Sequence, residues 1–143
     1  MKHLIAIDDL CIMYEGEKRI KVKTPLHYLD LNDYSFKKIK EASHSGPEFI
    51  CSYELCMDII NSFLNQPNMK KHKKDFSEFK KSRNTNDVVS FLWYFESIDG
   101  CHQFYKYEAP IVIKELKKWC KLNGLEYLEP DVFAVNFGHS IPN

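Results

Sequence analysis

Residues 45–64, which read SGPEFICSYELCMDIINSFL, carry the strongest helix signal in the chain. Ser45 and Glu48 have the spacing of a capping box, and Pro47 suits the first turn of a helix. From Phe49 onward, apolar side chains recur every three or four residues, so one face of this helix should be buried. A helix with such a wide apolar face needs partners, so the stretch predicts a packed core around it.

The segment before this helix predicts strands and one short helix. Residues 1–23 alternate apolar and polar side chains around a turn at Glu15 and Gly16, which is typical of a small antiparallel meander. Residues 33–42 should form a short helix, capped by Asn32 or by the first residue of the segment. That helix is short enough to need a partner.

The segment after it has two interpretations. Residues 88–98 are rich in β-branched and aromatic side chains, and Asp99-Gly100 joins them to a second aromatic stretch. This pattern favours a β-hairpin. A buried helix that Gly100 terminates is the alternative, because a continuous apolar run does not separate the two.

The C-terminal part predicts one more helix and one or two strands. Residues 110–123 should be helical, and Gly124 followed by Leu125 is a stop signal of the Schellman type. Residues 126–137 read as one or two strands. Together the elements predict an α+β fold: a small antiparallel or mixed sheet, made of the N-terminal meander, the later hairpin and the C-terminal strand, packs against about three helices.

The length of 143 residues fits a single globular domain, residues 1–143. No apolar stretch reaches the roughly 18 residues that a membrane span needs. The short apolar run before Asp8 is too small for a signal peptide, so we predict a cytoplasmic protein with no membrane contact. Its five cysteines should be reduced thiols rather than disulfides. No motif predicts a metal site or a cofactor.

Residues 65–85 form the one strong change in composition. They hold seven cations and two carboxylates, a charge of about +5, while the whole chain has a formal net charge of zero. Closely spaced lysines can neutralise phosphates, and aromatic side chains among them can stack on bases. This basic connecting segment can be mobile, although two of its phenylalanines are spaced for one face of a short helix. The candidate residues for binding a partner or a nucleic acid are Lys70, Lys71, Lys73, Lys74, Lys80, Lys81, Arg83, Phe76 and Phe79.

An acidic strand end raises the possibility of catalysis. The predicted strand LIAID, residues 4–8, resembles the opening of ribonuclease H-like nucleases. The resemblance implies that Asp8 would help to hold two magnesium ions, with further carboxylates from later elements. The candidates for those carboxylates are Glu41, Asp58, Asp87 and Asp99.

The absence of a reaction motif favours binding over catalysis. In size and in its enrichment in lysine and asparagine, the chain resembles accessory proteins of bacteriophages and mobile elements, such as inhibitors of host defence complexes, and also toxin-neutralising immunity proteins. This resemblance implies an inhibitor that occludes a protein partner, for example a nucleic-acid-processing complex. Direct binding of nucleic acid through residues 70–83 is the first alternative, and the metal-dependent nuclease is the second.

Overall fold

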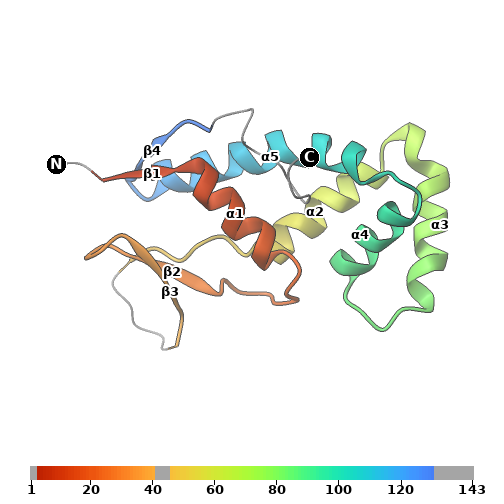
Figure 1. Ribbon diagram of the computed structural model, residues 1–143, viewed down its shortest axis with the longest axis horizontal. Helices are drawn as coiled ribbons and strands as arrows, with labels where there is room; N and C mark the ends of the chain where they lie inside the picture. Colours follow the sequence, from red (N-terminus) through yellow and green to blue (C-terminus); the bar gives the residue numbers. More distant parts are fainter. Residues whose placement is uncertain (1–2, 41–45, 131–143) are drawn as a thin grey trace.

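The computed structural model describes residues 3–40 and 46–130, which form a mainly helical protein (Figure 1). Five α-helices and one short 3-10 helix lie in these two ranges. In chain order the elements are β1 (Leu4–Ala6), α1 (Ile7–Glu17), β2 (His27–Asp30), β3 (Ser35–Lys38), α2 (Ser52–Leu64), η1 (Pro67–Met69), α3 (Lys70–Lys81), α4 (Asp87–Ser97), α5 (Cys101–Leu122) and β4 (Glu126–Leu128).

The prediction of one small sheet, made of the N-terminal meander, a later hairpin and the C-terminal strand, is wrong. Its place is taken by two separate two-stranded sheets, in which β1 pairs with β4 in parallel and β2 pairs with β3 in antiparallel orientation. Both sheets lie toward one end of the molecule, and α3 and α4 form the other end (Figure 1). Helices and strands are combined as in an α+β protein in general, but the helices supply most of the structure.

Helix α1 replaces most of the predicted N-terminal meander. Ile7, Leu10 and Tyr14 are fully buried, and their spacing of three and four places them on one side of a helix. The first turn also holds two aspartates, which the positive end of the helix dipole stabilises. Glu15 and Gly16, expected in a turn between strands, belong to the last turn of α1.

The β2–β3 hairpin occupies most of the segment predicted as a helix over residues 33–42. Asp30 accepts the backbone N–H of Asn32 at 2.9 Å, and Asp33 accepts that of Ser35 at 3.1 Å. Aspartates that bond the backbone two residues ahead build turns, so they compete with helix capping here. The last two residues of the predicted helix lie outside the described ranges.

The predicted central helix is present, but it begins at Ser52 rather than at Pro47. The residues before it are extended along β2, where the backbone N–H of Leu29 donates to the Pro47 carbonyl at 2.9 Å. A Cβ atom on Gly46 would lie 1.6 Å from the Leu29 carbonyl oxygen, so this approach of two chain segments requires glycine. Ser45, the first residue of the predicted capping box, lies outside the described ranges.

Two helices, α4 and α5, replace the predicted hairpin. The Asn86 side chain accepts the N–H of Val89 at 3.0 Å and caps α4. At the other end of α4, Asp99 has a φ of 57° and the Gly100 N–H donates to the Phe95 carbonyl at 2.7 Å, which is a Schellman-type stop. The alternative of a buried helix is therefore correct, and Asp99-Gly100 joins two helices.

Helix α5 is longer than predicted, because it begins at Cys101 and continues through Pro110. Its predicted end is confirmed. Gly124 has a φ of 67°, and the Leu125 N–H donates to the Cys120 carbonyl at 2.8 Å. Strand β4 follows, and the part of the predicted C-terminal strands after residue 130 lies outside the described ranges.

Phenylalanine side chains join α2, α4 and α5 in the core. The Phe104 ring lies 5.3 Å from the Phe63 ring and 4.7 Å from the Phe91 ring between centroids, both in edge-to-face geometry. All three rings are buried. Within residues 3–40 and 46–130, no helix has the length and the apolar character that crossing a membrane requires.

Candidate binding surface

Helix α3 carries most of the cations that the sequence singled out, and it stands at one end of the molecule with α4 beside it (Figure 1). The six lysines among these cations lie on α3, and Arg83 follows just after the helix. Six of the seven are exposed and Lys80 is half-buried; the exposed ones are Lys70, Lys71, Lys73, Lys74, Lys81 and Arg83.

The aromatic side chains of α3 face the opposite way, toward α4. Phe76 is buried, with its ring centroid 5.4 Å from that of Phe91. Phe79 packs edge-on against Tyr94 at 5.6 Å, and His72 Nδ1 lies 3.1 Å from the Tyr94 hydroxyl oxygen. These rings anchor α3 to the core, so they are not free to stack on bases in this structure.

The cations in the C-terminal half of α3, and Arg83 just after it, have intramolecular partners. Lys80 Nζ lies 3.6 Å from a carboxylate oxygen of Asp87, and Lys81 Nζ lies 2.7 Å from one of Glu78. The guanidinium of Arg83 lies 4.2 Å from the centroid of a phenylalanine ring of α3. This half of the helix is therefore partly neutralised by its surroundings.

The N-terminal half is different. Lys73 Nζ donates to the side-chain oxygen of Asn65 at 2.6 Å, which leaves its charge uncompensated. No residue in the described ranges forms an ion pair with Lys70, Lys71 or Lys74. We call Lys70, Lys71, Lys73 and Lys74 the α3 lysine cluster.

A second group of charged side chains lies in the interior, between α1, α2 and α5. Lys18 Nζ donates to both carboxylate oxygens of Glu108 at 3.1 Å, and the Tyr14 hydroxyl donates to Glu108 at 2.6 Å. Glu15 adds a second carboxylate 2.8 Å from Lys18 Nζ. The side chains of Lys18 and Glu108 are completely buried, so the described structure offers them no route to a substrate.

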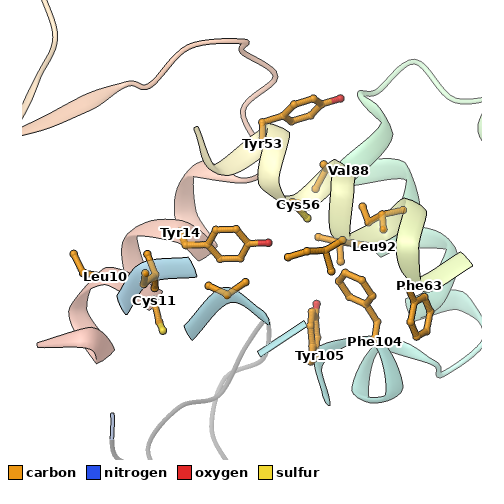
Figure 2. Packing of buried hydrophobic residues seen from close by; sticks show 14 of the residues in the cluster. Leu10, Cys11, Tyr14, Tyr53, Cys56, Phe63, Val88, Leu92, Phe104 and Tyr105 are labelled. Carbon is orange, nitrogen blue, oxygen red and sulfur yellow. The ribbon is translucent and has the colours of Figure 1, made fainter. Parts of the chain in front are cut away.

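Figure 2 shows the packing of buried hydrophobic side chains, with the Tyr14 ring reaching from α1 toward Cys56 of α2. The Cys56 thiol lies 3.8 Å from a Glu108 oxygen. Burial is the main cause that raises the pKa of Glu108, and the nearby Lys18 ammonium opposes it. Burial likewise raises the pKa of the Tyr14 hydroxyl well above its usual range, which keeps this hydroxyl protonated as the donor to Glu108.

The buried cysteines are poor candidates for nucleophiles. Burial raises the pKa of the Cys11 and Cys56 thiols to about 12 and that of Cys120 to about 11. A nucleophilic cysteine needs a thiolate, which a depressed pKa supplies. The chemistry of these three thiols is therefore that of small core side chains.

The expectation that Asp8 ends a strand is wrong. Strand β1 ends at Ala6, and Asp8 lies in the first turn of α1. Within the described ranges, no three histidine, cysteine or acidic side chains are grouped so that they could hold a metal ion. Glu41, one of the carboxylates considered with Asp8, lies outside those ranges.

No protein-family model matches this chain, and no curated protein or solved structure shows significant similarity to it. Among the charged groups described above, the α3 lysine cluster is the most concentrated uncompensated charge on the surface of the described residues.

Sequence reasoning found the lysines but missed the buried ion pair. Lys18 and Glu108 are 90 positions apart, and no local pattern connects them. One signal was available: Lys18 follows Tyr14 by four positions, which would have placed both on the buried side of α1 if that helix had been predicted.

Proposed function

We propose that this protein acts in the cytoplasm as an inhibitor or accessory protein that binds an acidic surface of a protein partner through the α3 lysine cluster and occludes that surface. One observation carries the proposal. Four uncompensated lysines project from the first turns of a helix whose aromatic side chains anchor it to the core. A charged surface held in this way can steer a partner of opposite charge and fix its orientation.

The arrangement of these lysines is unfavourable for the helix itself. They stand at the N-terminal end of α3, where the helix dipole disfavours positive charge, and no acidic residue lies in the first turn. Lys70 is also three and four residues from Lys73 and Lys74, and like charges at these spacings cost roughly 0.2–0.5 kcal/mol per pair. A bound anion would relieve both effects, which supports a role in binding.

A protein partner is favoured over a nucleic acid because of the orientation of the aromatic side chains. Binding of single strands relies on aromatic rings that stack on bases, but Phe76 and Phe79 pack against α4. Lysine ammonium groups act as point charges and lack the planar fork with which arginine reads phosphates. Only Arg83 offers such a fork here, and it lies over a phenylalanine ring.

The test is an affinity pull-down from host lysate with and without nuclease, using the full chain and two variants. The first variant replaces the α3 lysine cluster with glutamine. The control variant makes the same change in charge elsewhere, at four exposed lysines: Lys21, Lys23, Lys38 and Lys40. Thermal unfolding confirms that each variant is folded, and the α3 variant should be at least as stable as the native chain because the repulsion above is removed.

We expect one stoichiometric protein partner that remains bound after nuclease treatment, binds the control variant, and is lost from the α3 variant. Recovery of nucleic acid without a stable protein partner would establish direct nucleic-acid binding instead. A partner that binds the α3 variant as well as the native chain would remove α3 from the interface and refute the proposal.

A further inference from the structure

Helix α1 packs against α5 and α2 with one side, and its opposite side is exposed. Four exposed residues follow one another along that side at intervals of three, four and three, so they form one stripe on the helix: Asp9, Ile12, Gly16 and Arg19. Lys18 keeps helical backbone angles, with φ −63° and ψ −19°, so Arg19 continues the stripe just beyond the last residue of α1. We call these four residues the α1 stripe.

The middle of the α1 stripe combines a protruding apolar side chain with an open notch. Ile12 is 70% exposed, whereas Ile7 and Leu10 on the other side of the helix are fully buried. A Cβ atom added at Gly16 would meet no heavy atom within 4 Å. Because glycine has no side chain, a side chain from another molecule can approach the helix backbone closely at this position.

The two ends of the α1 stripe carry opposite charges. Asp9 lies in the first turn of α1, and Arg19 follows its last turn. No residue in the described ranges forms an ion pair with either side chain. The backbone of Arg19 is held in place, because its carbonyl accepts a hydrogen bond from the Asn86 side chain at 2.8 Å. The stripe therefore presents a carboxylate at one end and a guanidinium at the other.

The α1 stripe is complementary to itself when two copies of the helix run antiparallel. About a two-fold axis beside position 14, Ile12 of each copy faces the notch at Gly16 of the other copy. Asp9 of each copy then faces Arg19 of the other, so every contact occurs twice. Intervals of three and four are also those at which the side chains of paired helices interlock. A different partner would not require a stripe that matches itself in the reverse direction, so the pattern favours a second copy of this chain.

We propose that this protein forms a symmetric homodimer in which two α1 helices pair in antiparallel orientation through the α1 stripe. Ile12 of each copy covers Gly16 of the other, and the two ion pairs between Asp9 and Arg19 fix the register. One short helix buries less than the roughly 800 Å² per partner of a standard interface, so the dimer is weak and reversible. The dimer is independent of the proposed function, because α3 lies at the end of the molecule away from α1 (Figure 1).

Sedimentation equilibrium of the full chain, from about 1 µM to about 1 mM, measures the dissociation constant of this dimer. The first variant is Ile12→Gln. Its matched control is Leu122→Gln, which makes a similar change at a side chain of α5 that is 75% exposed. Two charge variants, Asp9→Arg and Arg19→Asp, are measured alone and as an equimolar mixture. Thermal unfolding confirms that each variant is folded.

We expect the native chain and Leu122→Gln to dimerise equally, and Ile12→Gln to raise the dissociation constant about tenfold or more. Each charge variant alone should stay monomeric, because like charges then face each other at both ends of the contact. The mixture should form a dimer with one copy of each variant, because each end of the contact then joins an arginine to an aspartate.

Three results would overturn the proposal. The first is a native chain that remains monomeric up to about 1 mM. The second is an unchanged dissociation constant for Ile12→Gln, which would place any dimer contact elsewhere. The third is a mixture of the two folded charge variants that stays monomeric although the native chain dimerises, which would exclude the antiparallel register.

Discussion

The buried pair of Lys18 and Glu108 gives the sharpest prediction about stability. Replacing Glu108 with leucine removes the acceptor of two hydrogen bonds from Lys18 Nζ and one from the Tyr14 hydroxyl. Lys18 then keeps Glu15 as its only carboxylate among the contacts described, and its ammonium remains fully buried. Removing one partner of a buried ion pair costs roughly 3–5 kcal/mol, because the other charge is left without compensation.

We expect Glu108→Leu to lower the free energy of unfolding by about 3 kcal/mol, toward the low end of that range because Glu15 remains. Lys18→Met should also destabilise the protein, but protonation of Glu108 limits the cost, since burial already raises the pKa of this carboxyl group. Replacing both residues together removes both charges at once. The double variant should therefore lie within about 1 kcal/mol of the native chain or exceed its stability.

Urea denaturation of the native chain and the three variants measures these free energies and gives the coupling energy of the pair. A constant m-value would show that the variants unfold from comparable native states. We expect a coupling energy of about 2 kcal/mol or more between Lys18 and Glu108. Two results would refute the idea that each buried charge is stabilised by the other: additive effects of the two single replacements, or a decrease in the free energy of unfolding below about 1 kcal/mol for Glu108→Leu.

Three further predictions concern pH, glycine and helix capping. Burial raises the pKa of Glu108 above the usual value of 4.5, so the folded protein binds a proton there that the unfolded chain has lost, and the free energy of unfolding should fall as pH rises above 4.5. Glu108→Gln should lack this dependence, and parallel pH profiles for the two proteins in urea denaturation would contradict the prediction. Gly16→Ala should stabilise the protein by about 0.5–1 kcal/mol, because Gly16 lies in a helix with open space around it, whereas Gly46→Ala should destabilise it by about 1–3 kcal/mol, because the new Cβ atom meets the Leu29 carbonyl. Equal changes of the free energy of unfolding in chemical denaturation would refute the close approach of Gly46 to Leu29. Asn86→Ala should cost about 1 kcal/mol through the lost cap of α4, and an unchanged thermal midpoint would argue against this cap.

The features that could be predicted from the sequence are those set by neighbouring residues. The stop of α5 at Gly124 needs only a residue that tolerates positive φ after a helical pattern. The apolar period of α2 is likewise local, and it survives even though the helix starts five residues later than Pro47. The helix in the basic segment follows from the spacing of Phe76 and Phe79, which pack against α4.

The features that could not be predicted depend on residues far apart in the chain. The run from Val88 to Phe95 is buried on several sides, so its apolar residues show no clear period. Asp99 has a positive φ, which a hairpin turn of type I′ and a Schellman stop both require. The sequence Asp-Gly therefore marks a reversal of the chain without specifying whether strands or helices are joined.

Lysine has two contrasting roles in this protein, although the lysines look alike in the sequence. Lys18 is buried and contributes to stability only together with Glu108, so removing it alone should destabilise the fold. The α3 lysine cluster works against its own helix, so removing it should leave the fold intact or make it more stable. A lysine that lowers the stability of the fold, and that has no described partner for its charge, is a better candidate for binding a ligand or protein than a lysine that is simply solvated. Stability measurements can thus separate structural from functional lysines before any partner is known.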